Sequence, residues 1–259
     1  MGNEPNIVPS KLENPINIRV LLIIFAIGVV IYVSLNLLDG DNAGNLAFVL
    51  SVVITSIVAF SSFKVSKRYW GTKVFGRAYL SLGLGFLCYA IAEVMYYTFE
   101  LYLGIDPYPS VADIFFFALY PFALGHIILN LKFFNTKISK LPKIWMPIIP
   151  ISFFLIYTIL SFQEIDEPNF DYYFGTAFVV GASITLSFAI LGASTFRQGL
   201  LGTAWLLLVI GILLDAIGDV WYYSLEIFGA YYDAHPVTVV WYIANIMIVY
   251  ALYKHKEII

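Results

Sequence analysis

Residues 200–229 read LLGTAWLLLVIGILLDAIGDVWYYSLEIFG. The run contains neither Lys nor Arg, and it is long enough to cross a ~30 Å hydrocarbon core as a helix. It nevertheless carries the acids Asp215, Asp219 and Glu226. An ionisable side chain inside a membrane is costly, so such residues are functional candidates. The stretch therefore predicts a membrane-spanning helix that also carries part of a site.

The whole chain has the composition of a membrane protein. Of its 259 residues, 61% are hydrophobic and 12% are charged, and its mean hydropathy is +0.85. The segments between apolar runs are too short for a soluble catalytic domain. We therefore expect an all-α integral membrane protein, a single transmembrane domain over residues 1–259, with eight transmembrane helices at roughly 17–37, 42–63, 78–103, 110–131, 144–162, 171–193, 200–229 and 236–253.

Charged residues outside these runs indicate the topology. All 14 Lys and Arg residues fall on one side of the eight-span arrangement, and the loops on the other side carry only Asp and Glu. By the positive-inside rule, we expect both termini to be cytoplasmic in a multi-pass protein of the cell membrane. The basic segment 64–77 then adjoins anionic lipid, so we expect membrane lipids, and no nucleic acid, as partners.

One acidic sequence occurs twice. Residues 90–100 read AIAEVMYYTFE and residues 216–226 read AIGDVWYYSLE, with six of 11 positions identical. The offset of 126 residues maps the third span onto the seventh and the fourth onto the eighth. Because each half then has four spans, both halves enter the membrane from the same side. This predicts two parallel four-helix repeats, at about 17–131 and 144–253.

The duplicated segments predict two polar stripes, because residues three, four or seven positions apart share a helix face. Glu93 and Asp219 lie about 15 Å below the outer ends of their spans. We expect the stripes to converge in a bundle of spans three, four, seven and eight, with the other four spans outside. The candidate ligand-binding residues on the stripes are Glu93, Tyr97 and Glu100 in the third span and Asp215, Asp219, Tyr223 and Glu226 in the seventh.

The fourth and eighth spans add candidates for the same site. Asp113 begins the fourth span and His126 lies further along it, while Asn245 lies in the eighth span at the depth of Asp219. No Lys or Arg lies deep within a span, so the acids must be protonated, share protons, or bind a cation or a ligand's donors. Alternatively, Glu93 and Asp219 are structural and hydrogen-bond between helices.

Few residues suit a metal site or a cofactor. The chain has three His, and one of them, His255, lies in the C-terminal tail, which argues against a three-histidine zinc site. The single cysteine, Cys88, rules out an intrachain disulfide. We expect neither a metal nor a cofactor.

The segment from the third to the fourth span carries three motifs, AEVMYYTFELYLG at 92–104, DPYPSVADIFF at 106–116 and LYP at 119–121. It resembles the multi-span input module that precedes cyclase or histidine-kinase domains in many bacterial signalling proteins. That module carries Gly-Asp, Tyr-Tyr-Glu and Pro-Phe-Pro-Ser-x-Ala-Asp segments before a Tyr-Pro, and this chain has Ala-Glu in place of Gly-Asp. The resemblance implies a sensor function.

Four dipeptides, one in each of the same four spans, carry a second resemblance: Ala92-Glu93, Gly125-His126, Gly218-Asp219 and Ala244-Asn245. They are similar to the Gly-Asp, Gly-His, Asp and Ala-Gln positions of the YhhN-type lysoplasmalogenase family, which are eight-span membrane hydrolases. This resemblance implies that Glu93, Asp219 and His126 are catalytic and act on an ether lipid. Such hydrolysis uses paired carboxylates with different proton affinities.

Three functional hypotheses follow. We favour a sensor-like module that binds a small ligand, a lipid or a cation in an acidic pocket open to the outer side, with a separate signalling partner at the cytoplasmic face. The alternative is a lysoplasmalogenase-like membrane hydrolase, so whether the chain is an enzyme stays open. The third is a cation- or proton-coupled transporter, since an acidic site between repeats also suits one.

Overall fold

The computed structural model describes residues 16–72, 74–133, 140–163, 165–196 and 202–257. Within these ranges the chain forms eight helices that are long and apolar enough to cross a membrane, and it forms no strand. The predicted all-α fold with eight spans is therefore confirmed, and it indicates a multi-pass membrane protein. The helices are α1 (Ile18–Leu37), α2 (Gly40–Arg68), α3 (Phe75–Tyr97), α4 (Val111–Phe133), α5 (Lys140–Ser161), α6 (Phe170–Phe196), α7 (Gly202–Phe228) and α8 (Pro236–Glu257).

The ends of several helices are fixed by local chemistry. Asp39 caps α2, since its carboxylate accepts a hydrogen bond from the backbone N–H of Asn42 over 3.1 Å. The third span continues beyond α3 through a short π-helix, η1 (Thr98–Leu103). It stops at Gly104, whose φ of 60° favours glycine. The third span therefore runs over 29 residues, Phe75–Leu103, and begins three residues before the predicted range of 78–103.

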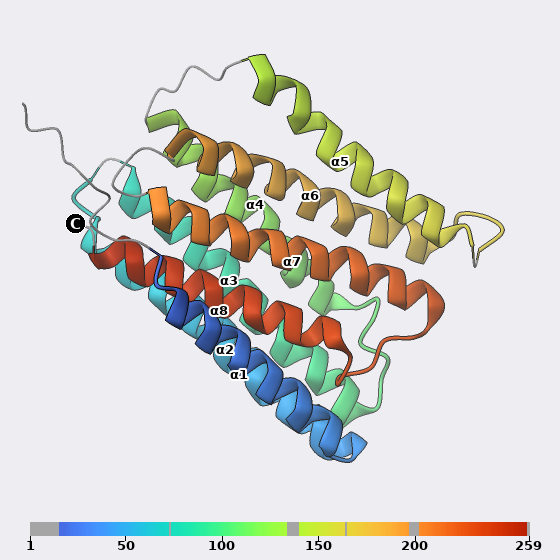
Figure 1. Ribbon diagram of the computed structural model, residues 1–259. Coiled ribbons are helices and arrows are strands. Elements are labelled where there is room, and N and C mark those ends of the chain that lie inside the picture. The colour runs from blue at the N-terminus through green and yellow to red at the C-terminus, as the bar shows by residue number, and fades with distance from the viewer. Residues whose placement is uncertain (1–15, 73, 134–139, 164, 197–201, 258–259) are drawn as a thin grey trace, which may run out of the picture.

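Six helices form a closed ring. Going round it, α2 packs against α3, α3 against α4, α4 against α6, α6 against α7, α7 against α8, and α8 against α2. Figure 1 shows the helices side by side, with the beginning of α1 and the end of α8 at the same end of the bundle. Among the described residues, no Cα of α3 or α4 lies within 8 Å of a Cα of α7 or α8. Only side chains can therefore fill the space between these two helix pairs.

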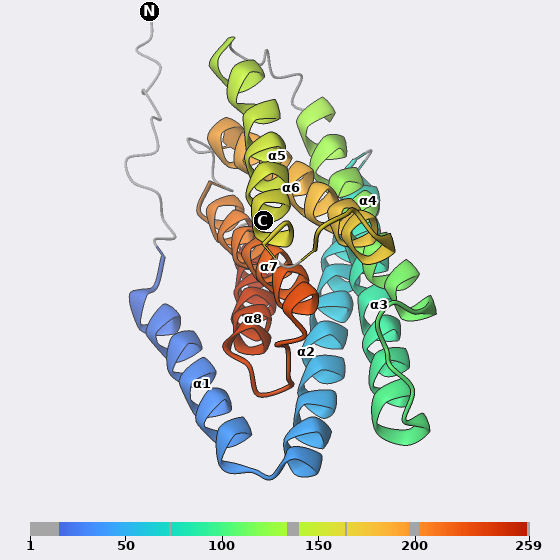
Figure 2. The same cartoon turned by 90° about the vertical axis from the view of Figure 1, so that its right-hand side faces the viewer.

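α1 and α5 lie outside the ring, at opposite margins of the bundle in Figure 1, and Figure 2 shows α1 set apart from its neighbours. α1 packs mainly on α8, and α5 mainly on α6. The prediction that α2 and α6 also lie outside was wrong. α2 buries a row of small side chains, Ala47, Ser51 and Thr55, spaced by four residues. Such a row lets neighbouring helices approach closely, which brings α2 into the ring between α3 and α8.

The largest apolar core fills the half of the ring where α7 begins. It includes Trp205 and Tyr79, which are among the largest fully buried side chains. Leu82 and Ile127 belong to the same core. This packing closes one half of the ring and leaves the polar side chains of the other half around an internal space.

Candidate functional site

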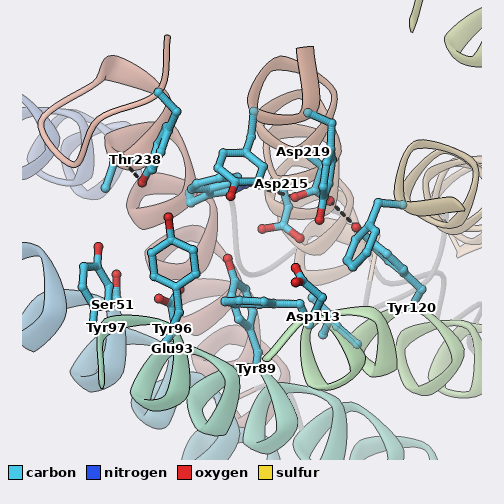
Figure 3. A pocket seen from close by; sticks show the side chains of 17 residues that line it. Ser51, Tyr89, Glu93, Tyr96, Tyr97, Asp113, Tyr120, Asp215, Asp219 and Thr238 are labelled. Atoms are coloured by element: carbon cyan, nitrogen blue, oxygen red, sulfur yellow. Dashed lines mark hydrogen bonds between the residues drawn. The ribbon is translucent and has the colours of Figure 1, made fainter. Parts of the chain in front are cut away.

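The ring encloses a cavity in the half where α3 and α7 end. Side chains from all six ring helices line it, together with Tyr231 of the α7–α8 loop (Figure 3). Its volume of about 60 Å³ is several times the ~10–15 Å³ that one water molecule needs. The cavity therefore has room for several waters or for a small organic group.

Asp219 is held in the cavity wall by two donors. The hydroxyl of Tyr120 donates to Oδ2 over 2.8 Å, and the indole Nε1 of Trp241 donates to Oδ1 over 3.2 Å. Gly218 makes room for this indole, since a Cβ at that position would lie 2.5 Å from Nε1. Because Tyr120 belongs to α4 and Trp241 to α8, the carboxylate of α7 is fixed by two other helices.

Asp215 lies one helical turn before Asp219 on the same face of α7. Its side chain is only 8% exposed, and its Oδ1 has no hydrogen-bond partner among the described residues. Figure 3 shows its carboxyl group pointing into the cavity. A buried carboxyl oxygen without a donor is costly, so this atom points to a donor or a positive charge that the chain does not itself supply.

The opposite wall is formed by α3. Glu93 lies there with Tyr89 and Tyr97 one turn away on either side, and Tyr96 beside them. Figure 3 shows these side chains rising from α3 toward α7 and α8. Glu93 and Asp219, predicted at equivalent positions of the two stripes, thus face one cavity from two walls.

Asp113 has a structural role as well as a place in the cavity. Its Oδ2 accepts a hydrogen bond from the backbone N–H of Ser110 over 2.7 Å, and the Ser110 hydroxyl accepts one from Ala112 N over 3.1 Å. This reciprocal pair caps the first turn of α4. The cap holds the Asp113 side chain at the cavity wall.

The rest of the lining is aromatic. Ten of the 17 lining residues are aromatic and none is Lys, Arg or His, so the cavity combines acids with ring faces. Tyr222 lies 5.0 Å from Tyr223 and 5.3 Å from Trp241, measured between ring centroids. The lining tyrosines are Tyr89, Tyr96, Tyr97, Tyr120, Tyr222, Tyr223 and Tyr231.

A further acid lies beside the cavity, in the α7–α8 loop. Asp233 accepts a hydrogen bond from the hydroxyl of Tyr97 over 3.3 Å. Burial raises the pKa of Asp233 above its ordinary value, although this hydrogen bond lowers it in part. Burial also lowers the pKa of His235 in the same loop. A further carboxyl group therefore lies in the same loop as Tyr231, which lines the cavity.

Three of the predicted ligand-binding residues do not line the cavity. Glu100 lies in η1, where its Oε2 is buried without a hydrogen-bond partner among the described residues. Glu226 lies nearer the end of α7 and is partly buried. Asn245 is buried, and its Nδ2 donates to the backbone oxygen of Trp241 over 3.0 Å. The other six, Glu93, Tyr97, Asp113, Asp215, Asp219 and Tyr223, all line it.

His126, the third residue implied for a hydrolase, also lies away from the cavity. Its ring is fully buried, and Nδ1 donates to the backbone oxygen of Ala78 over 3.0 Å. It stacks on Trp205 with ring centroids 5.6 Å apart and packs against Tyr79 at 4.8 Å. Its surroundings belong to the apolar core of the other half of the ring.

Several cavity residues were not predicted as site residues. Tyr89 was detectable, since it lies four residues before Glu93 and matches Asp215 across the 126-residue offset. Tyr120 was also detectable, because it lies in the Leu-Tyr-Pro motif at 119–121. Ser51 and Trp241 carried no such signal. Their positions depend on which helices close the ring.

Within the described part of the chain, no group of three or more His, Cys, Asp or Glu side chains converges as a metal site would require. No protein-family model, curated protein or solved structure shows detectable similarity to this chain. The chemistry of the cavity must therefore be inferred from its own residues.

Proposed function

We propose that this multi-pass protein of the cell membrane binds a small ligand in the acidic cavity and acts as a sensor-like module. The observation that carries the proposal is the buried Oδ1 of Asp215, which faces the cavity without a hydrogen-bond partner among the described residues. The surrounding volume is large enough for a ligand to supply that partner.

The orientation that we propose places both termini in the cytoplasm and the cavity toward the outer side. α2 ends with Lys67 and Arg68, while the connections at the opposite ends of the helices contain Asp39, Asp166 and Asp233. The cavity lies in the half of the ring near those acidic connections. The positive-inside rule supports this orientation.

We further propose that the ring consists of two parallel repeats. The successive helices α2, α3 and α4 form one half, and α6, α7 and α8 form the other. Within each half successive helices pack against each other, and the halves meet where α4 packs against α6 and where α8 packs against α2. Across the offset of 126 residues, Glu93 matches Asp219 and Tyr97 matches Tyr223, and all four line the cavity. Two equivalent walls around one site support a parallel duplication.

The gap between the helix pairs suggests how binding would be sensed. Since α3 and α4 make no close backbone contact with α7 and α8, a ligand between them would change the spacing that the pairs prefer. If the helix pairs can take two arrangements with different spacing, a ligand shifts the equilibrium between them only when its affinity for the two arrangements differs. The same helices run to the opposite end of the bundle, where a signalling partner could read the shift.

A hydrolase is the second candidate, because two neighbouring carboxyl groups have unlike surroundings. Asp219 accepts two hydrogen bonds, whereas Oδ1 of Asp215 accepts none from the described residues. Acid–base pairs in enzymes are separated by such differences. Because His126 lies outside the cavity, hydrolysis here would depend on the carboxyl groups and water alone.

Cysteine accessibility tests whether the cavity opens to the outer side. In a Cys88→Ser background, Tyr96→Cys places a thiol in the cavity, and Val94→Cys places one on the exposed face of the same helix. A membrane-impermeant thiol reagent added outside should modify Tyr96→Cys and leave Val94→Cys, which faces lipid, unmodified. Modification of Tyr96→Cys only after the inner face is exposed would contradict the proposed opening.

A further inference from the structure

We propose that the ligand of the cavity is an organic ammonium ion, either a free amine or the ammonium headgroup of a lipid. This inference rests on the proposed ligand-binding function, and it names the class of ligand. It follows from the charge of the lining, from its rings and from Oδ1 of Asp215, a buried carboxyl oxygen of the lining that has no donor among the described residues.

The charge of the lining selects a cation. Glu93, Asp113, Asp215 and Asp219 face the cavity, and no Lys, Arg or His accompanies them. An anionic ligand would bring another negative charge into a low-dielectric space that has none to compensate it. A cation instead supplies the positive charge that compensates these carboxylates, which the lining itself does not provide.

The hydrogen bonds of α7 show where the positive group would lie. Both oxygens of Asp219 already accept bonds, from Tyr120 and from Trp241. Oδ1 of Asp215, one turn away, accepts none from the described residues and points into the cavity. Asp215 is therefore the residue that pairs with the ligand, while Asp219 holds the walls in place.

The rings distinguish an organic cation from a metal ion. A divalent metal needs several oxygen ligands at about 2.0–2.6 Å, and no three acidic or histidine side chains of the described residues converge in that way. Ring faces such as those of Tyr96, Tyr222 and Trp241 attract an ammonium group that lies within about 6 Å of the ring centroid. A lining that is mostly aromatic therefore suits ammonium better than a metal.

Calorimetric titration of the full chain in phosphatidylglycerol nanodiscs tests this proposal, because that lipid carries no ammonium group. The probes are tetramethylammonium, choline and the neutral isostere of choline in which carbon replaces nitrogen. We expect both ammonium probes to bind, with choline at least about tenfold tighter than its isostere. Equal binding of choline and isostere, or no binding of either ammonium probe, would overturn the proposal.

Matched variants locate the interaction. Asp215→Asn should weaken tetramethylammonium binding by about tenfold or more, whereas Glu226→Gln, on the same helix outside the cavity, should leave it unchanged. In case Asp215→Asn does not fold, Tyr96→Phe keeps a ring face and should retain binding, while Tyr96→Leu removes the face and should weaken it. Equal affinities for tetramethylammonium in the Phe and Leu variants would contradict the role of the ring.

Two further comparisons complete the test. The first distinguishes a lipid headgroup from a free amine, and the second distinguishes failure of the ligand class from failure of the proposed open cavity. In phosphatidylcholine nanodiscs, weaker choline binding and a bound lipid in native mass spectra would identify a lipid headgroup, and unchanged binding would identify a free amine. If the Tyr96→Cys thiol reacts from outside but no ammonium probe binds, the ligand class is wrong and the open cavity stands. If the thiol does not react either, both proposals fail.

Discussion

The hydroxyl of Tyr120 donates to the carboxylate of Asp219 over 2.8 Å and so connects α4 to α7 across the cavity. No Cα of α3 or α4 lies within 8 Å of a Cα of α7 or α8 in the described chain, so side chains alone make this connection. Trp241 holds the same carboxylate from α8. Asp219 is thus held by two donors, and Asp215 beside it can accept a ligand.

Replacing Tyr120 by Phe should destabilise the protein. The ring stays, but one hydrogen bond to the partly buried carboxylate of Asp219 is lost, and hydrogen bonds to charged groups contribute about 1.5–3 kcal/mol. We expect a lower unfolding temperature by intrinsic fluorescence in detergent. Tyr102→Phe, at an exposed tyrosine, is the control and should leave that temperature unchanged. An equal effect of both substitutions would contradict the role of the Tyr120 hydroxyl.

Adding a methyl group at Gly218 should displace the indole of Trp241. A Cβ there would lie 2.5 Å from Nε1, the atom that donates to Asp219. Overpacking of this kind costs about 1–3 kcal/mol, so Gly218→Ala should lower the unfolding temperature and shift tryptophan fluorescence. Gly40→Ala is the control, because no atom lies within 4 Å of its added Cβ. Wild-type stability and fluorescence in Gly218→Ala would contradict this packing.

The stability of the protein should depend on pH through Asp233. Burial raises the pKa of this carboxyl, so the folded state holds its proton more tightly than the unfolded state does. The resulting stabilisation is complete at pH values below the unfolded-state pKa of about 3.9, and it is lost as pH rises through the raised pKa of the folded state. Between about pH 4 and pH 7, the unfolding temperature of Asp233→Asn should therefore fall less than that of the wild type.

Asp166→Asn provides the control for this pH dependence. Asp166 is an exposed acid in the α5–α6 connection, so its neutralisation should leave the wild-type profile in place. If the unfolding temperatures of the wild type and of Asp233→Asn fall in parallel as pH rises, the carboxyl group of Asp233 does not cause the pH dependence.

His126 should matter for stability and not for ligand binding. Its ring fills the core between Tyr79 and Trp205, so His126→Ala should cost on the order of 3 kcal/mol by leaving a void. Because the side chain lies outside the cavity, tetramethylammonium affinity of the folded variant should match that of the wild type. A large loss of affinity without loss of stability would instead place His126 at the site.

Labelling at the two ends of the bundle should fix the orientation in the membrane. With Cys88→Ser as background, Asp166→Cys should react with an impermeant thiol reagent from outside, and Lys67→Cys should react only after permeabilisation. Both positions are exposed, so access to the protein surface is matched. Labelling of Lys67→Cys from outside would reverse the proposed topology.

The sequence was sufficient to predict the spans and most of the acidic stripe. Apolar runs of membrane length fix where helices cross, and spacing by three or four residues fixes which side chains share a face. Glu93, Asp215 and Asp219 were found in this way, and all three line the cavity. These features depend only on local order along one helix.

The rest depends on how helices meet, which local spacing does not encode. Asn245 was predicted at the depth of Asp219, but Trp241 contacts Asp219 there, and the Asn245 side chain donates to the backbone oxygen of Trp241 on its own helix. His126 likewise faces the apolar core, and Ser51 enters the cavity only because α2 closes the ring. The depth of a residue follows from helical rise, whereas its neighbours follow from packing of the whole bundle.

The occupancy of the cavity is the most direct test of the proposed ligand site. A cryo-electron microscopy map of the full chain in phosphatidylglycerol nanodiscs, prepared with and without tetramethylammonium, would show it. We expect a compact density beside the Asp215 carboxyl, among the rings of Tyr96 and Trp241, in the sample with tetramethylammonium only. Identical maps, with the carboxyl groups of Glu93 and Asp215 bonded to neighbouring side chains across a closed gap, would show that the acids only hold the helices together.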